Sequence, residues 1–364
     1  MTAPAATSSA LSQDVLLVLL ITPPNEEWIS RVKAKHPGLE IRWANILEEG
    51  GSFKNMKDPG DDIFEGATLG FCFQYPPSAE RLKSMRFIQL PSAGIDFWSG
   101  HETFARKEVT FCTANGVHAP QIAEWVIGSY LSHQHHFKRY TESMRTGLWE
   151  SPFATTVQDC TAARMGVLGY GAIGRHAARI AKSMGMQIYA YTRSERSTPD
   201  SRKDDSYCVP ETGDPEGLLP AKWFHGASKE AINDFLGQDL DILVLALPLT
   251  KESQGLISTE QFQILSKKKT FISNVARGGI INTDALVEAL ESGKIRGAAL
   301  DVTDPEPLPA DHKLWKTPNL LITPHVSWQS QDLMSRVLDM LEFNLDNLGS
   351  GRPLTNVVSK DFGY

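Results

Sequence analysis

The chain has 364 residues, enough for two domains with ordinary hydrophobic cores. Its 43 acidic and 36 basic residues give a formal net charge of −7, which argues against a nucleic-acid-binding surface. Its 4 cysteines form no C-x-x-C pair, so we expect reduced thiols and a cytoplasmic protein rather than a disulfide scaffold.

The first third of the chain has the pattern of a small α/β domain. Residues 15–21 form an apolar run that is too short to cross a bilayer and has no signal-peptide features, so we expect a buried strand and no membrane partner. Further strands are expected at residues 39–43, 68–73, 87–90 and 109–112, and helices at residues 25–35 and 78–85. This alternation predicts a parallel sheet. This part has no glycine-rich motif that would bind a phosphate group. We therefore expect it to hold a reactant other than a phosphate-containing cofactor.

Residues 91–96, PSAGID, leave the strand expected at 87–90 as a loop of small residues. Such a loop can direct backbone N–H groups at a carboxylate. A simple strand-to-helix turn explains the same residues equally well.

A long helical segment is expected over residues 119–147. It contains His133, His135 and His136, of which only the first and last share a helix face. Because no carboxylate joins them, we expect no metal site.

Residues 164–194 have the pattern of a strand, a glycine-rich turn, a helix and a second strand. The parts are residues 165–168, the motif G-x-G-x-x-G made by Gly169, Gly171 and Gly174, residues 173–184 and residues 187–191. The first glycine allows a tight turn, the second lets a pyrophosphate approach the backbone, and the third lets the helix pack close to the strand. The start of the helix then offers N–H groups to an anion, so we expect dinucleotide binding.

The end of the second strand indicates which dinucleotide. An NAD site has a carboxylate there for the ribose, whereas this chain has Thr192, Arg193 and Ser194. A guanidinium between two hydroxyls suits the 2′-phosphate of NADP(H). The alternative is that Arg193 is a solvated loop cation and Glu195 binds the ribose. The polar residues 197–226 then form a loop insertion. It either covers the adenine end of the cofactor or is a surface loop without a role in binding, and we favour the surface loop.

From residue 239 the α/β alternation resumes, and each apolar run ends in polar residues, Gly or Pro. The trailing residues are Pro248, Arg277, Asp301, Glu306 and His325, and the carboxyl ends of parallel strands meet at one edge of a sheet. There Arg277 can clamp the carboxylate and carbonyl of a 2-oxo acid, and His325 can supply the proton that accompanies hydride transfer. Glu306 can orient the imidazole and favour its charged form, and Asp301 is expected to meet the cofactor. Each of these residues alone has a structural explanation, but together they predict a reductase.

The chain resembles the D-isomer-specific 2-hydroxyacid dehydrogenase family, especially its glyoxylate/hydroxypyruvate reductase-like members. The resemblance runs from about Gly70 to the end of the chain, through PSAGID, ANGVHAPQIAEW, VLGYGAIG, LALPLTKESQGLI, SNVARGGIINTDALVEAL, GAALDVTDPEPLP and ITPHVSW. It implies an α/β fold with two parallel-sheet domains and a cleft between them. A flavodoxin-like substrate domain is expected over residues 1–120 and 329–364, completed by a helix at 329–349, and a Rossmann domain over residues 121–328.

The resemblance also implies the roles of individual residues. Arg277, Glu306 and His325 correspond to the catalytic trio, and Ala93 and Gly94 to the loop that binds the substrate carboxylate. The implied cofactor contacts are Gly169, Tyr170, Gly171, Ala172, Ile173, Gly174, Thr192, Arg193, Ser194, Leu247, Pro248, Val275, Ala276, Asp301 and His325. The implied cofactor is NADP(H), with NAD(H) as an alternative, and the long helix after Ala119 is expected to help build a homodimer.

Trp328 stands where many members of the family have a small residue. With Phe73, Tyr75 and Trp149 it is a candidate for the pocket wall, although ordinary core packing explains these aromatics equally well. A dinucleotide-sensing, corepressor-like protein is the alternative function. Formate oxidation fits poorly, because that branch has an amide in place of Glu306.

Overall fold

The computed structural model describes residues 10–47, 56–72 and 76–360. The chain divides into two compact units, Met1–Val117 with Gln331–Tyr364, and His118–Ser330. Each unit is built on one parallel sheet with flanking helices, which confirms the predicted fold class. None of the described helices is long and apolar enough to cross a membrane.

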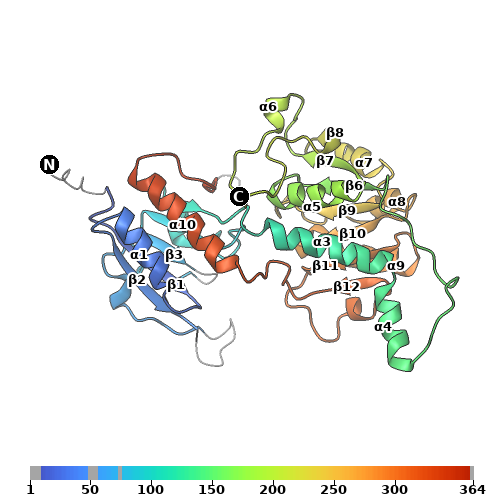
Figure 1. Ribbon diagram of the computed structural model, residues 1–364, viewed down its shortest axis with the longest axis horizontal. Helices are drawn as coiled ribbons and strands as arrows, with labels where there is room; N and C mark the ends of the chain where they lie inside the picture. Colours follow the sequence, from blue (N-terminus) through green and yellow to red (C-terminus); the bar gives the residue numbers. More distant parts are fainter. Residues whose placement is uncertain (1–9, 48–55, 73–75, 361–364) are drawn as a thin grey trace. The chain divides into compact units, whose positions relative to one another are not determined.

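The first unit contains a five-stranded parallel sheet in the order β2-β1-β3-β4-β5, the order of flavodoxin-like folds. The strands are β1 (Val15–Leu20), β2 (Glu40–Asn45), β3 (Leu69–Cys72), β4 (Phe87–Gln89) and β5 (Thr110–Cys112). The helices are α1 (Glu26–Lys35), the 3₁₀ turn η1 (Asp62–Phe64), α2 (Glu102–Ala105) and α10 (Leu333–Gly349). Helices α1 and α10 lie side by side (Figure 1), joined by the Trp28 indole N–H, which donates to the Leu338 carbonyl at 3.1 Å.

One sequence prediction for this unit was wrong, and the start of one helix was expected about a turn too early. Residues 78–85 form consecutive turns rather than a helix, with i to i+3 bonds such as the Leu82 N–H to the Ala79 carbonyl at 3.1 Å. Because the backbone bonds of this segment span i to i+3, its backbone does not continue into the i to i+4 ladder of an α-helix. The last helix begins at Leu333 rather than at residue 329, because the residues before it are held in a separate turn.

The second unit contains a seven-stranded parallel sheet in the order β12-β11-β10-β9-β6-β7-β8. The strands are β6 (Arg164–Leu168), β7 (Gln187–Thr192), β8 (Pro220–His225), β9 (Ile242–Leu245), β10 (Phe271–Asn274), β11 (Gly297–Leu300) and β12 (Leu320–Ile322). The helices are α3 (Ala119–Gln134), α4 (Phe137–Thr146), α5 (Ala172–Ser183), α6 (Pro199–Arg202), α7 (Lys229–Leu236), α8 (Thr259–Leu265) and α9 (Thr283–Glu291), with 3₁₀ turns η2 (Gly278–Ile280) and η3 (Lys313–Lys316).

Helices cover both faces of this sheet (Figure 1). Helices α3 and α5 bury one face over a core that includes Tyr130, Ala177 and Phe271. Helices α7, α8 and α9 bury the other face through residues such as Phe235 and Phe262. Strand order reverses between β6 and β9, which is the crevice where doubly wound sheets bind their ligands, at the carboxyl ends of the strands.

Two predictions for the second unit also need correction. The helix expected over residues 119–147 is broken into α3 and α4, because His136 adopts a left-handed φ of 57°. The insertion at residues 197–226 contains α6 and the edge strand β8, which pairs with β7.

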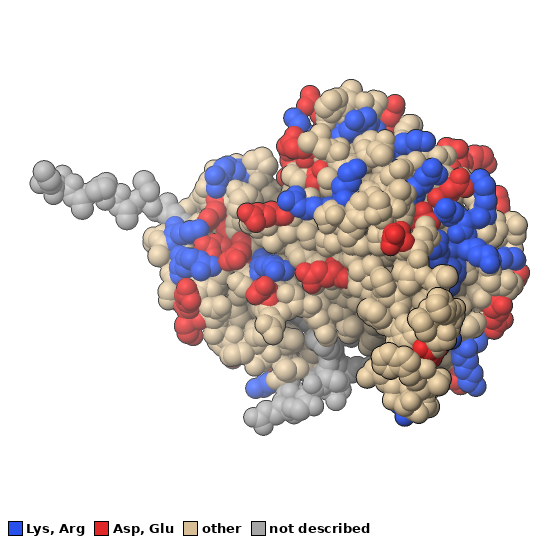
Figure 2. Space-filling model, turned by 45° about the vertical axis from the view of Figure 1, so that its right-hand side comes forward, with Lys and Arg blue, Asp and Glu red and all other residues tan. Residues whose placement is uncertain are grey.

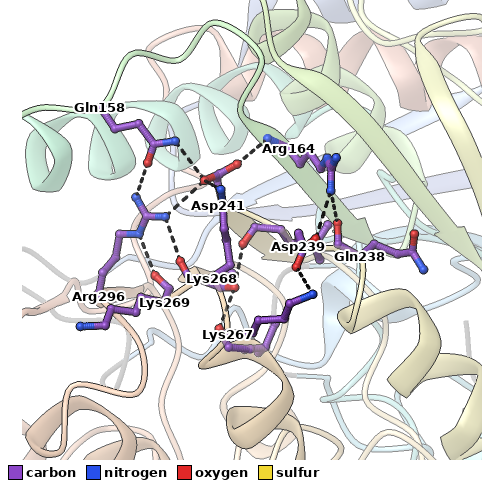
Figure 3. A network of polar contacts seen from close by, with 12 residues as sticks. Gln158, Arg164, Gln238, Asp239, Asp241, Lys267, Lys268, Lys269 and Arg296 are labelled. Atoms are coloured by element: carbon purple, nitrogen blue, oxygen red, sulfur yellow. Dashed lines mark hydrogen bonds and ion pairs between the residues drawn. The ribbon is translucent and has the colours of Figure 1, made fainter.

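Asp241 ties together several segments at the amino-terminal edge of this sheet (Figure 3). It is 3% exposed, and its carboxylate accepts hydrogen bonds from the Arg164 N–H at 2.9 Å and the Gln158 amide at 3.1 Å. It also pairs with the Arg296 guanidinium at 3.4 Å. Because the segments before β6 and β11 both depend on this carboxylate, it stabilises the edge opposite the candidate site.

We therefore expect Asp241→Asn to lower the free energy of unfolding by about 2–4 kcal/mol, because the new amide N–H faces other donors and the Arg296 guanidinium loses the carboxylate of its ion pair. Urea unfolding measures the change. Asp239→Asn is the matched control, since that side chain is exposed and pairs with Lys267 at 2.9 Å on the surface. Equal, small shifts of the unfolding midpoint in both variants would contradict the role of Asp241.

Candidate active site

The glycine motif forms the turn between β6 and α5. Gly169 has a φ of +99°, and a Cβ there would lie 2.6 Å from the Ala246 carbonyl oxygen. A Cβ at Gly174 would lie 2.6 Å from the Gly169 carbonyl oxygen. These two glycines are therefore required by the fold itself.

Gly171 differs from the other two glycines. A Cβ there would meet no protein atom within 4 Å, and its φ of −93° is open to any residue. The packing within the protein thus does not explain a glycine at this position, whereas the close approach of a ligand does. Gly171 is also the residue that precedes α5, and no side chain caps the N–H groups of the helix there. The turn therefore fits the pyrophosphate of a dinucleotide.

The residues expected to select the cofactor follow β7. The Thr192 hydroxyl donates to the Ser194 carbonyl at 2.7 Å and closes a tight turn around Arg193. Arg193 and Glu195 are both exposed. The pKa of Glu252 is lowered, first by a hydrogen bond from Thr250 and also by the charge of Arg193. Arg193 therefore lies near the loop that follows β9.

Arg277 lies in the loop after β10, where Asn274 shapes the backbone. The Asn274 side chain accepts from the Ala276 N–H at 3.1 Å and donates to the Arg277 carbonyl at 3.0 Å. A Cβ at Gly278 would lie 2.0 Å from the Thr303 carbonyl. A glycine at 278 therefore lets the Arg277 loop pack directly against the loop that follows β11.

Glu306 and His325 follow the neighbouring strands β11 and β12, and the structure brings them together. The His325 Nδ1 and the Glu306 Oε1 are 2.6 Å apart, a hydrogen-bonded pair whose side chains are 40% and 41% exposed. This contact leaves Nε2 as the imidazole nitrogen that can meet a substrate.

Asp301 organises the turn that carries His325. One carboxylate oxygen accepts from the Thr323 hydroxyl at 2.6 Å and the Val326 N–H at 2.9 Å. The other accepts from the Ser327 N–H at 3.0 Å and the Ser327 hydroxyl at 2.5 Å. Since a carboxylate offers about four acceptor sites, a direct contact with a cofactor would have to displace one of these bonds. The sequence analysis interpreted Asp301 as a cofactor contact. It did not identify the role of Asp301 in holding the turn that carries His325.

His325 itself has a left-handed φ of 55°, which costs a residue with a side chain about 1–2 kcal/mol. Its N–H donates to the Asp301 carbonyl at 2.8 Å. Its carbonyl accepts from the Trp328 indole N–H at 2.7 Å, and the Trp328 carbonyl accepts from Gln121 on α3 at 2.9 Å. Trp328 therefore holds the backbone of His325 in place, and its side chain also packs on the core beneath α3.

The other predicted contacts lie at the same edge of the sheet or in the first unit. Ser253 donates to the Pro248 carbonyl at 2.8 Å, Val275 and Ala276 are buried at the end of β10, and Leu247 packs on the core beneath α7 to α9. In the first unit Ala93 is exposed, Gly94 is half-buried, and the Gly94 carbonyl accepts from the Ser92 hydroxyl at 2.6 Å.

Among the candidate wall residues, Phe73 and Tyr75 lie outside the described residues. Trp149 is 96% exposed on the segment after α4. Of the three histidines, His133 packs against Phe271 with tilted rings whose centroids are 4.9 Å apart, and burial lowers its pKa to about 4.

Residues 127–327 match the family model of the D-isomer specific 2-hydroxyacid dehydrogenase, NAD binding domain. The chain belongs to this family. It is thus an oxidoreductase that reduces 2-oxo acids with a nicotinamide dinucleotide. The corepressor-like alternative receives no support from these comparisons.

Individual relatives of this dehydrogenase cover most of its length. A glyoxylate reductase of Thermofilum pendens is 30% identical over 281 residues, 76% of each chain. A glycerate dehydrogenase of Methylorubrum extorquens is 27% identical over 331 residues, 87% of this chain and 94% of that one. The crystal structure of a D-isomer specific 2-hydroxyacid dehydrogenase from Xanthobacter autotrophicus Py2, in complex with NADPH and MES, is 26% identical with a TM-score of 0.72 and covers 97% of this chain and 100% of that one.

Proposed function

We propose that this dehydrogenase is an NADP(H)-preferring reductase that converts small 2-oxo acids of the glyoxylate or hydroxypyruvate type to D-2-hydroxy acids. We propose NAD(H) as the alternative cofactor. The observation that carries the proposal is the 2.6 Å contact between Glu306 and His325, formed at the carboxyl edge of a sheet whose neighbouring strand presents Arg277.

His325 supplies the proton in this mechanism. A bound reduced nicotinamide would supply the hydride to the carbonyl carbon of the substrate. Because Glu306 engages Nδ1, the imidazole presents Nε2 to the carbonyl oxygen and donates its proton there as the alcohol forms. The carboxylate of Glu306 fixes the orientation of the imidazole through this contact.

Arg277 orients the substrate. Its guanidinium can bind the carboxylate through two parallel hydrogen bonds while its charge polarises the neighbouring carbonyl. The amides of Ala93 and Gly94 are proposed as further donors to the carboxylate. Such clamping holds the reacting carbon in one position, which is a large part of the catalytic advantage of an enzyme.

The dinucleotide is proposed to lie along the turn at residues 169–174, with its pyrophosphate at the start of α5 and its 2′-phosphate at Thr192, Arg193 and Ser194. The open space above Gly171 supports the first contact. The NADPH bound to the Xanthobacter relative supports the choice of a cofactor that carries a 2′-phosphate. The backbones of Leu247, Pro248, Val275 and Ala276 complete the proposed contacts.

A spectrophotometric assay tests the proposed function. The oxidation of NADPH should be followed with glyoxylate, hydroxypyruvate, 2-oxoisocaproate and phenylpyruvate, each against NADH. We expect turnover with the smaller acids and a lower KM for NADPH. If none of the four acids is turned over, the proposal is wrong. If only the bulky acids are turned over, the proposed substrate class is wrong.

Arg193→Ala tests the cofactor preference. Loss of a charge-assisted bond to the 2′-phosphate should raise the KM for NADPH about tenfold or more and leave the KM for NADH nearly unchanged. Glu195→Ala is the control, since it should raise the KM for NADH only if Glu195 binds the ribose. Equal changes for both cofactors in Arg193→Ala would remove the assignment.

We also propose a homodimer formed through α4 and the segment that follows it, with no nucleic-acid or membrane partner and a cytoplasmic location. Helix α4 buries none of its residues and extends away from the sheet (Figure 1). Large apolar side chains are exposed on this arm, among them Phe137, Tyr140, Met144, Leu148, Trp149, Phe153 and Val157. An exposed apolar patch of this extent is typical of a protein interface. Figure 2 shows both acidic and basic side chains on the face that it presents.

Sedimentation measurements test the dimer. The wild-type protein should sediment as a dimer, and Met144→Glu, at a side chain 80% exposed, should yield monomers because it places a charge in the apolar contact. Phe343→Glu on α10, at a side chain 48% exposed, is the matched control and should stay dimeric. A monomeric wild-type protein would refute the interface.

A further inference from the structure

The insertion between β7 and β8 is folded rather than loose. Helix α6 has a capping box in which Thr198 and Ser201 satisfy each other's N–H groups. Farther along, the Asp204 N–H donates to the Pro215 carbonyl at 2.8 Å. The segment therefore has a defined shape, whereas its polar sequence predicts a loop.

Asp214 is the centre of this segment and also its link to the glycine motif. Its carboxylate accepts from the N–H groups of Leu218 at 2.9 Å and Leu219 at 3.2 Å. The third donor is the hydroxyl of Tyr170, at 2.8 Å. Asp214 is 6% exposed and Tyr170 is 4% exposed, so this bond lies in the interior. Tyr170 is the residue between the first two glycines of the motif.

Arg175, in the first turn of α5, makes a second link. Its guanidinium donates to the carbonyls of Asp214 and of Arg202, the latter at 2.8 Å, and pairs with Asp204 at 3.1 Å. The same guanidinium lies 5.0 Å from the centre of the Tyr170 ring. Burial, together with the charge of Asp214, raises the pKa of Tyr170, which keeps the phenol a neutral donor.

The turn is therefore held from two sides. On the sheet side, the N–H groups of Gly169 and Tyr170 donate to the Tyr191 carbonyl at 3.1 and 3.2 Å. On the other side, Asp214 of the insertion accepts a hydrogen bond from the Tyr170 hydroxyl. Since the side chain of Tyr170 is buried in this way, only its backbone remains for a cofactor.

We infer that Asp214 and the Tyr170 hydroxyl are positioning residues for the dinucleotide. They hold the turn at residues 169–171 in the one shape that presents the N–H groups at the start of α5 to the pyrophosphate. An anion site of backbone amides binds strongly only when the amides are already oriented, because ordering them on binding lowers the affinity. The inference rests on the proposed dinucleotide binding and gives the insertion a role in it.

Tyr170→Phe tests the inference, because it removes only the hydroxyl. The Kd for NADPH should be measured by fluorescence titration, without turnover, and should rise about tenfold while kcat at saturating NADPH stays within about twofold of wild type. Asp214→Asn is the second variant and should shift the Kd in the same direction. Tyr140→Phe is the matched control, since that hydroxyl bonds to Thr155 at 2.8 Å on the exposed arm, and its Kd should not change.

An unchanged Kd in Tyr170→Phe and Asp214→Asn, with only a lower melting temperature, would show a merely structural role and overturn the inference. A wild-type protein that binds NADPH but reduces no 2-oxo acid would refute the proposed function and leave this test intact. Binding of neither NADPH nor NADH would refute both.

Discussion

Replacing His325 by glutamine should lower kcat by about 10²–10⁴-fold, the range that general acid catalysis contributes. The glutamine side chain is polar and of similar length, but it has no ionisable proton to deliver to the carbonyl oxygen. The Kd for NADPH should change little, because the turn that carries residue 325 is held through backbone groups and through Asp301. Single-turnover kinetics separates the chemical step from binding.

His312→Gln is the matched control for this variant. His312 lies in the loop between β11 and β12, where its Nδ1 accepts from the Leu314 N–H at 3.3 Å and caps η3. Its loss should affect stability slightly and kcat hardly at all. If His325→Gln turned over at a near-normal rate, another group would have to supply the proton, and the role of Glu306 would fall with that of His325.

The parts of the fold that the sequence predicted well are those determined by local chemistry. Strands β6 and β7 and helix α5 lie where the apolar spacing and the glycine motif placed them, because each signal is contained within a few residues. Gly169 has the positive φ, and Gly174 the close packing, that the motif implies. The trailing residues of β10, β11 and β12 lie at one edge because parallel order determines it.

The missed features depend on distant partners. Strand β8 is an edge strand that starts with a proline and is only partly buried, so its sequence has no apolar run. No glycine or proline in the sequence marks the helix break at His136. The bonds of Asp301 to the His325 turn and of Asp214 to Tyr170 join residues far apart in the sequence, and a polar residue in a polar segment carries no sign of its partner.

These missed contacts share one feature. The groups proposed to do chemistry, the His325 imidazole and the amides at the start of α5, are each placed by a buried carboxylate that does not itself need to touch a ligand. A buried carboxylate is costly unless its hydrogen bonds are filled, and here backbone N–H groups and hydroxyls fill them. The same bonds that satisfy the charge therefore define the shape of the turn.

Arg277→Ala should lower kcat/KM for the 2-oxo acid by about 10³-fold or more, because it removes both the clamp on the carboxylate and the charge beside the carbonyl. Arg277→Lys keeps the charge but not the fork of two donors, so we expect an intermediate loss, mostly in KM. Both variants lose or alter the bond from the Arg277 guanidinium to the Ala276 carbonyl at 2.7 Å, but Asn274 still holds the loop through the backbone carbonyl of residue 277 and the N–H of Ala276. The Kd for NADPH measured without substrate should therefore stay near that of wild type. A kcat/KM within about threefold of wild type in Arg277→Ala would place the substrate carboxylate on other groups.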